Sequence, residues 1–186
     1  RCLRRKYAQP AEASLARSSV WGSAPGGMVE RVRDADWAPD GSDLAVVRRV
    51  GGLERLEFPL GKVLYETSGF ISDIRFSPAG DLIAFADHPV YADDAGAVSI
   101  VDKEGHRTIL SEGWISVHGV AWARDGGEVW FGGTRGSAVS GDGIYAATRD
   151  GRLRSVLVGP SRYKLLDIAT DGRVLIGHER DDRVVE

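Results

Sequence analysis

One five-residue motif recurs along this chain and decides the fold. It reads Trp37-Ala38-Pro39-Asp40-Gly41 at its first occurrence, and the later copies are Phe76-Ser77-Pro78-Ala79-Gly80, Trp122-Ala123-Arg124-Asp125-Gly126 and Ile168-Ala169-Thr170-Asp171-Gly172. Successive motif glycines lie 39, 46 and 46 residues apart, a period typical of repeat architectures. Proline presets φ in a turn, aspartate bonds its own backbone, and glycine accepts a positive φ. Each copy therefore predicts a tight turn between two strands.

The residues after each motif glycine alternate as in a strand with one buried face. Leu44, Ile83, Val129 and Leu175 stand three residues after the glycines, and Val46, Phe85 and Phe131 stand five residues after the first three. A second turn follows in the first three units, at 59–61, 103–106 and 149–152. Four antiparallel strands in about 40 to 46 residues are typical of a β-propeller blade. A β-sandwich, which also has short strands and frequent turns, is the alternative.

The predicted fold class is all-β: a β-propeller fragment with about three complete four-stranded antiparallel blades and partial blades at both ends. The complete blades are expected at about 34–66, 71–110 and 117–158, and their innermost strands at about 34–38, 72–77 and 118–123. An N-terminal segment, 1–27, is expected to be a linker or partial outer strands. The blades should cover 28–178, and 179–186 would be the truncated tail of the next blade.

Two alternatives describe how such a ring ends. Strands at 15–20 and 28–32, joined by strands at 164–169 and 173–178, would complete one blade and close a four-bladed ring. The favoured alternative is an open arc cut from a ring of about six to eight blades, within the range known for propellers. Because Trp37, Phe76 and Trp122 hold the same place in the motif, we expect all three to be buried between adjacent blades.

Composition excludes several classes of function. The chain has 186 residues, and its 24 Lys and Arg against 27 Asp and Glu give a formal net charge of -3, so nucleic-acid binding is not expected. A single cysteine and four scattered histidines offer no internal disulfide and no zinc framework. No apolar run approaches the roughly 18 to 20 residues that span a bilayer, so we expect no membrane insertion by this segment.

The repeat unit has a recognisable form: an aromatic residue, then Ser/Ala-Pro-Asp-Gly, a strand, and a hydrophobic strand that ends in Asp and Gly. Over about 28–178 it resembles the TolB-like, WD-like propeller repeat of bacterial proteins. More narrowly, 55–67, 87–90 and 110–114 are similar to the propeller that follows the catalytic domain in some bacterial serine/threonine protein kinases. The chain has no kinase glycine-rich loop, no catalytic His-Arg-Asp and no Asp-Phe-Gly, so we expect no phosphoryl transfer from it.

Binding residues of a propeller are expected on the loops beside the central channel. Two of these loops join blades, at 67–72 and 112–116, and two long ones lie within blades, at 88–96 and 134–143. Their aromatic, acidic and basic side chains predict a surface for a ligand or a partner protein, made of Phe70, His88, Asp93, Asp94, Trp114, His118 and Arg135. In the alternative interpretation the two aromatic residues wedge between blades and the two aspartates are merely solvated.

No reacting group is indicated by any motif. There is no Gly-x-Ser-x-Gly nucleophile elbow, and turn chemistry accounts for Asp40, Asp125 and Asp171 better than calcium does. We therefore expect a non-catalytic module without a cofactor or a metal. Its expected partners are a protein or a small-molecule ligand, together with the remaining blades of the ring.

The resemblance implies a larger bacterial parent protein, with a serine/threonine kinase as the leading interpretation and the propeller as its sensor or interaction portion. Two other parents stay open. One is a prolyl-oligopeptidase-like hydrolase, in which the propeller gates access to the catalytic domain. The other is a periplasmic TolB-like partner of membrane machinery. The compartment, periplasmic or cytoplasmic, is left open as well.

Overall fold

Antiparallel strands account for nearly all of the chain. The computed structural model describes residues 13–17, 26–136, 142–159, 162–169 and 171–179, and these contain fifteen strands and no helix. Because the described residues contain no helix, they contain none able to cross a membrane. The prediction of an all-β propeller fragment is confirmed.

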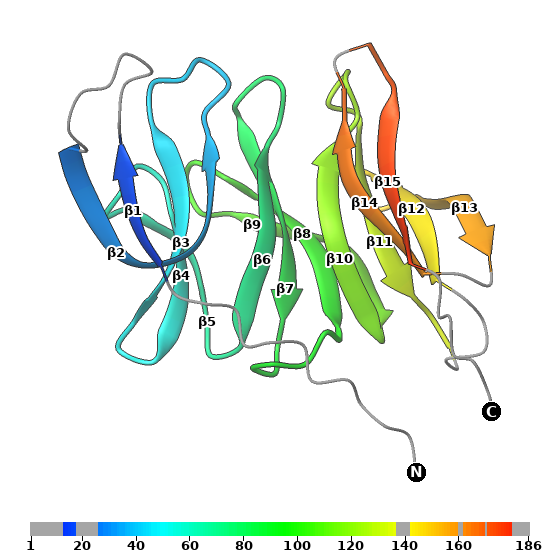
Figure 1. The fold of residues 1–186 in the computed structure, drawn as a ribbon, viewed down its shortest axis with the longest axis horizontal. Coiled ribbons are helices and arrows are strands. Elements are labelled where there is room, and N and C mark those ends of the chain that lie inside the picture. The colour runs from blue at the N-terminus through cyan, green and yellow to red at the C-terminus, as the bar shows by residue number, and fades with distance from the viewer. Residues whose placement is uncertain (1–12, 18–25, 137–141, 160–161, 170, 180–186) are drawn as a thin grey trace.

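Apart from β1 (Ala13–Arg17), the strands form three four-stranded blades and half of a fourth (Figure 1). Blade one contains β2 (Gly26–Trp37), β3 (Leu44–Val50), β4 (Leu53–Glu57) and β5 (Val63–Thr67). Blade two contains β6 (Phe70–Phe76), β7 (Leu82–His88), β8 (Gly96–Asp102) and β9 (Arg107–Trp114). Blade three contains β10 (Ser116–Trp122), β11 (Glu128–Thr134), β12 (Asp142–Thr148) and β13 (Leu153–Gly159). The half-blade contains β14 (Arg162–Ile168) and β15 (Val174–Glu179).

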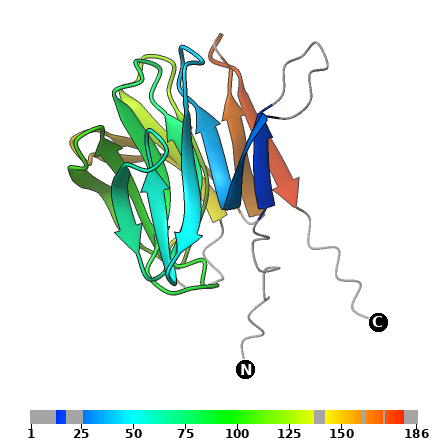
Figure 2. The same ribbon diagram turned by 90° about the vertical axis from the view of Figure 1, so that its left-hand side faces the viewer.

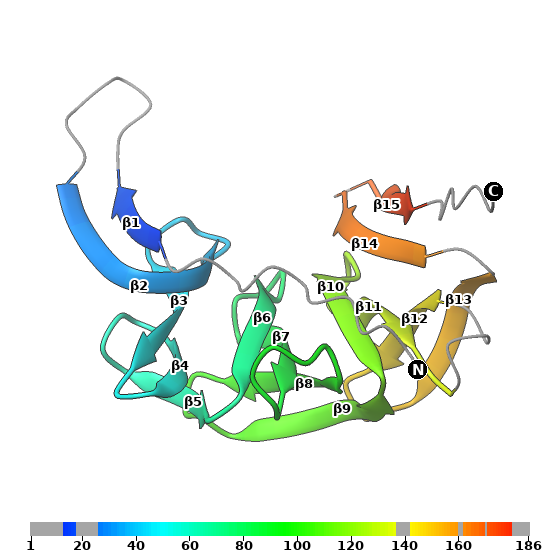
Figure 3. The same ribbon diagram turned by 60° about the horizontal axis from the view of Figure 1, so that its bottom comes forward.

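The sheets stand side by side in an open arc (Figure 3). The first strands of the units, β2, β6, β10 and β14, lie on the concave side, and the outermost strands, β5, β9 and β13, lie on the convex side. Figure 2 views this arc from the end formed by blade one, with the other blades behind it. The three innermost strands fall where the motif predicts them, within about two residues, except that β2 begins earlier.

The N-terminal strands differ from the prediction. β1 (Ala13–Arg17) pairs with the first half of β2 in the sheet of blade one, with Leu15 opposite Val29, so 28–32 is part of a long innermost strand and does not belong to a preceding blade. β14 and β15 form a separate two-stranded sheet. The described strands therefore do not make the shared blade that would close a four-bladed ring.

The motif turns have the predicted chemistry. The four turn glycines adopt left-handed φ values of 68°, 70°, 67° and 87°, at Gly41, Gly80, Gly126 and Gly172. The carboxylate of Asp40 accepts a hydrogen bond from the backbone N–H of Ser42, and Asp125 and Asp171 accept equivalent bonds two residues later in their turns. These aspartates stabilise turns, as the sequence indicates.

Apolar side chains fill the spaces between neighbouring blades. Phe76 is 8% exposed and meets Phe58 of blade one edge to face, with ring centroids 4.9 Å apart. Trp122 is 6% exposed, and its Nε1 donates to the carbonyl of Arg75 in blade two at 2.9 Å. These two aromatic residues of the motif thus pack against the blade that precedes them.

The expectation that Trp37 is equally buried is wrong, because its side chain is 46% exposed. The motif aromatic is covered by the blade before it, and no complete blade precedes blade one among the described residues. Burial of this position therefore depends on a neighbouring sheet and not on the motif alone.

We predict that Trp122→Ala lowers the free energy of unfolding by about 3–5 kcal/mol, because it removes a buried aromatic side chain and leaves a cavity. Trp37→Ala, at the same motif position but exposed, is the matched control and should cost clearly less. Urea titrations of both variants measure the difference. Equal losses would contradict the assignment of the motif aromatic to the space between blades.

Candidate ligand-binding cavity

A cavity of about 200 Å³ opens on the innermost strands of blade two, blade three and the half-blade. Its lining combines aromatic rings, hydroxyls and charged groups, contributed by Phe70, Ser72, Asp73, His88, Asp94, Ser116, Val117, His118, Tyr163 and Lys164. Four of the seven residues that the sequence predicts for a binding surface are among them: Phe70, His88, Asp94 and His118. Residues from three separate sheets therefore meet at one site.

The repeat contains the signal for two lining residues that sequence reasoning missed. Ser72, His118 and Lys164 each stand four residues before the first residue of their motif copy, and all three line the cavity. Each of their strands has an irregular register at or just after this position. Bulges of this kind redirect side chains beside functional sites. Aligning the units at this position would have identified Ser72 and Lys164.

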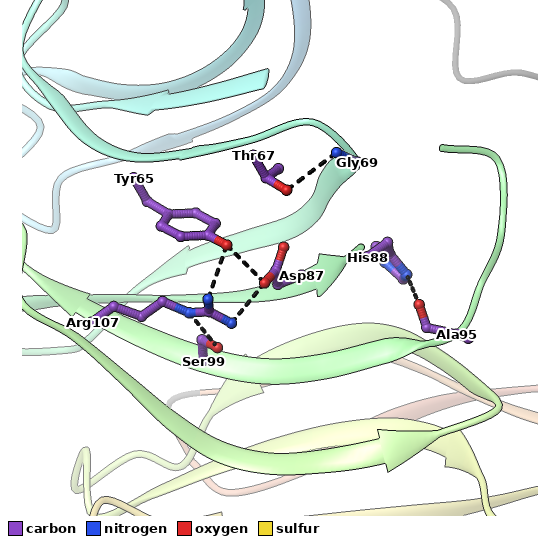
Figure 4. Close-up of polar contacts among 8 residues, drawn as sticks. All are labelled: Tyr65, Thr67, Gly69, Asp87, His88, Ala95, Ser99 and Arg107. Atoms are coloured by element: carbon purple, nitrogen blue, oxygen red, sulfur yellow. Dashed lines mark hydrogen bonds and ion pairs between the residues drawn. The ribbon is translucent and has the colours of Figure 1, made fainter. Parts of the chain in front are cut away.

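His88 is the buried end of the cavity. It is 1% exposed, and its ring stacks on Phe70 with centroids 4.0 Å apart and planes 7° apart. Its Nδ1 lies 3.3 Å from the carbonyl oxygen of Ala95, as Figure 4 shows, and its Nε2 lies 3.0 Å from Ser72 Oγ. Burial lowers the pKa of His88, and the neighbouring acidic side chains of Asp73, Asp94 and Asp87 oppose that shift only in part.

The backbone bends closely around this histidine. Gly69 precedes Phe70, and a Cβ there would collide with the backbone of His88 and Pro89. Asp73, next to Ser72, has a φ of 55°, a left-handed value that aspartate tolerates better than most residues. The Ser72 hydroxyl lies 3.0 Å from the Asp73 carboxylate. One hydroxyl is thus within hydrogen-bond distance of both a histidine and an aspartate.

A partly buried polar network supports the strand that ends in His88 (Figure 4). The carboxylate of Asp87 accepts hydrogen bonds from Tyr65 at 2.9 Å and from Arg107 at 2.6 Å. Arg107 also donates to Tyr65 and to Ser99, and its guanidinium lies 4.6 Å from the Tyr65 ring centroid. The network joins β5 of blade one to β7, β8 and β9 of blade two, and so fixes the position of the histidine backbone.

His118 forms the opposite wall. Its Nε2 lies 2.9 Å from the carbonyl oxygen of Tyr163 in the half-blade, and its Nδ1 lies 3.4 Å from Ser116 Oγ. Gly119 follows with a φ of 63°, and a Cβ at this position would collide with the backbone of Leu165. The close approach of two backbones places His118 against β14.

Three predicted residues do not line the cavity. The Asp93 carboxylate accepts a hydrogen bond from the N–H of Ala95 within the loop. Trp114 is 2% exposed, packs against Phe131 and Tyr145, and is covered by the Arg135 guanidinium, which lies 4.2 Å from the ring centroid. Trp114 thus has no exposed ring face to offer a ligand, because the end of β9 turns inward between blades. A binding role for Asp93 and Arg135 stays a prediction.

Metal ligands are not gathered in the described part of the chain. No group of three or more His, Cys, Asp and Glu side chains that could hold an ion occurs among those residues. The carboxylates of Asp34 and Asp36 accept hydrogen bonds from the backbone N–H groups of Ile74 and Phe76, at 2.9 and 2.8 Å. Burial raises the pKa of Asp34. These two carboxylates join blade one to blade two.

Comparison with known proteins identifies the fold and not the family. No protein-family model matches the chain, and no curated protein matches it either. Among solved structures, a structure from a study of two prolyl endopeptidases is similar with a TM-score of 0.63 and 16% identity, over 81% of this chain and 26% of that one. A TolB from Agrobacterium tumefaciens is similar with a TM-score of 0.59 and 20% identity, over 86% of this chain and 62% of that one. TolB from Acinetobacter baumannii is similar with a TM-score of 0.52 and 13% identity, over 80% of this chain and 36% of that one.

This chain therefore spans between about a quarter and just under two thirds of the length of those proteins. At such low identities the likeness concerns the architecture alone. The chain has the fold of a TolB-like β-propeller, with blades of the kind that prolyl endopeptidases also contain.

We predict that His88 makes stability fall on mild acidification. Its pKa in the folded chain is lowered by burial, so between that value and the ordinary value of about 6.5 the unfolded chain binds more protons. Stability from this group is present above pH 6.5 and is lost as the pH falls through that window. Urea titrations at pH 7.5 and 5.0 should show a larger loss for the parent chain than for His88→Asn. Identical losses would contradict the prediction.

Proposed function

We propose that this chain is a non-catalytic binding module, which recognises a small ligand in the cavity between blade two, blade three and the half-blade. The observation that carries the proposal is the meeting of polar and aromatic side chains from three sheets around one opening of about 200 Å³. Such concave sites, with a few convergent polar groups, are where proteins usually bind small molecules.

The rigidity of the walls supports binding. His88 and His118 are each hydrogen-bonded to a backbone carbonyl, and the partly buried network around Asp87 holds the strand that carries His88. A preformed site loses little conformational entropy when a ligand enters. A sensor needs this property, because its ligand should meet a site that is already shaped.

The contact between Ser72 and His88 resembles that between a nucleophile and its base. In a serine hydrolase a carboxylate stabilises the imidazolium that forms during catalysis. Here the second ring nitrogen faces the carbonyl of Ala95, and burial disfavours the charged ring. This environment favours a neutral histidine that orients a hydroxyl over one that accepts a proton during turnover.

We also propose that the module serves a larger bacterial protein, with a serine/threonine kinase as the leading candidate on the sequence resemblance. A gating propeller of a prolyl-oligopeptidase-like hydrolase is the second candidate, and the structural similarity to prolyl endopeptidases favours it. The third is a TolB-like protein partner. These candidates differ in their expected behaviour, because only the first requires a ligand site within the propeller itself.

A cavity-filling substitution tests the binding role. Ser116→Trp places a large side chain at the cavity wall, whereas Ser155→Trp, on the exposed outer strand β13, is the matched control. We expect fragment-sized molecules that bind the parent chain to shift NMR signals of the cavity residues. Their affinity should fall at least tenfold in Ser116→Trp and stay unchanged in Ser155→Trp.

Melting curves of both variants check that the fold survives. If bound fragments shift the signals of the motif turns and are indifferent to Ser116→Trp, the cavity is not the binding site. If no fragment binds the folded parent chain, the gating or protein-partner candidates gain support over the sensor.

A serine-directed fluorophosphonate tests the absence of catalysis. We expect no covalent adduct on Ser72 after prolonged exposure at neutral pH, as measured by intact mass and peptide mapping. The reason is that His88 is not placed to carry the positive charge that activation requires. An adduct on Ser72 that disappears in His88→Asn would reverse this part of the proposal.

A further inference from the structure

The hydrogen bonds inside the cavity indicate what a ligand must supply, and this inference rests on the binding function proposed above. A carbonyl oxygen can only accept, so the contact of His88 Nδ1 with Ala95 requires a proton on Nδ1. In the neutral ring, Nε2 is then an acceptor, and it lies 3.0 Å from the Ser72 hydroxyl. The same hydroxyl donates to the Asp73 carboxylate, also at 3.0 Å, and its single hydrogen cannot satisfy both acceptors fully.

The opposite wall repeats this arrangement. The contact of His118 Nε2 with the carbonyl of Tyr163 requires a proton on Nε2, so Nδ1 is the acceptor in the neutral ring. The Ser116 hydroxyl is the group that faces it, at 3.4 Å. Both serine hydroxyls are therefore engaged by acceptors of the cavity wall itself, and neither hydrogen is left for a ligand.

The cavity lining also contains a carboxylate, Asp73, and an ammonium group, Lys164. No ion pair joins Asp73 or Lys164 to any other part of the chain that the structure describes. Asp94 adds a second carboxylate to the lining. The Asp73 carboxylate, which has a hydroxyl donor but no cationic partner among the described residues, is well satisfied by an ammonium group, and Lys164 by an anion. The cavity thus offers complementary sites for both signs of charge.

Size and wall chemistry restrict the ligand further. The volume of about 200 Å³ lies below the roughly 300–1,000 Å³ of pockets that hold drug-sized molecules. The rings of Phe70 and Tyr163 provide apolar surface between the polar groups. A short aliphatic chain fits such a wall better than a sugar or a nucleotide.

We propose that the cavity binds a small zwitterion of the amino-acid class. Its ammonium group would donate to Asp73, with Asp94 close by, its carboxylate would face Lys164, and its aliphatic part would lie on Phe70 and Tyr163.

Three probes with the same four-carbon chain separate the contributions: 2-aminobutyrate carries both charges, butylamine only the ammonium, and butyrate only the carboxylate. Calorimetric or NMR titration of the full chain at pH 7.5 measures their affinities. We expect 2-aminobutyrate to bind at least tenfold more tightly than either single-charge probe. Butylamine should be sensitive to Asp73→Asn and butyrate to Lys164→Met.

The variants are chosen to keep the fold. Asparagine tolerates the left-handed backbone of residue 73, and Lys164 is exposed, so Lys164→Met remains informative even if Asp73→Asn is poorly folded. Each should weaken 2-aminobutyrate about tenfold or more, because a charged hydrogen bond is lost. Glu104→Gln and Arg124→Met, at exposed turn positions, are matched charge controls and should leave its affinity unchanged.

Equal binding of butyrate and 2-aminobutyrate would overturn the inference, and so would affinities that are indifferent to both cavity variants. Failure of all three probes also overturns it. The Ser116→Trp experiment then separates the two proposals. If fragments of another chemistry bind the parent chain and lose affinity in Ser116→Trp, the proposed binding function stands without the amino-acid ligand. If such fragments bind both chains equally, both proposals are wrong.

Discussion

The structure depends on how each innermost strand is held by the blade before it. The blades are separate sheets, so β6 and β10 share no backbone ladder with the blade that precedes them. Side chains make the connection instead: Asp34 and Asp36 accept from the N–H groups of β6, and Glu54, which is fully buried, accepts from Ile71 and from Arg33. An innermost strand is an edge strand, and unpaired backbone groups there would be costly or open to wrong pairing. Hydrogen bonds from these backbone groups to the preceding blade also set the distance between neighbouring innermost strands on the concave side.

Side-chain contacts between sheets also determine where the cavity lies. His118 joins blade three to the half-blade, because its Nε2 donates to the carbonyl of Tyr163. The same side chain also forms a wall of the cavity. Binding chemistry and blade packing therefore share a residue. The repeat keeps the scaffold constant, while the side chain four residues before the motif differs from unit to unit: Arg33, Ser72, His118 and Lys164. A varied set of functional groups on one repeated frame suffices to build an asymmetric site.

Much of this architecture could be predicted from the sequence, because turns and strand alternation are local. The turn glycines, the four-strand units and the innermost strands were all predictable from spacing and turn chemistry. The exposure of Trp37 was not, since burial there depends on a sheet and not on a neighbour in sequence. Trp114 packs between blades, as one of the two interpretations of the sequence had it, and only its tertiary contacts with Phe131 and Tyr145 decide between them. The contact between Ser72 and His88 requires the register irregularity in β6, and no single-residue pattern encodes it.

The exposure of Trp37 also has a practical meaning. An indole in contact with water emits at longer wavelength than a buried one and is open to collisional quenchers, whereas Trp114 and Trp122 are shielded between blades. Anything that comes to cover the blade-one end of the arc, whether another sheet or a second molecule, would shift this emission and protect it from quenching. The fluorescence of Trp37 thus reports on whether the blade-one end of the arc is covered.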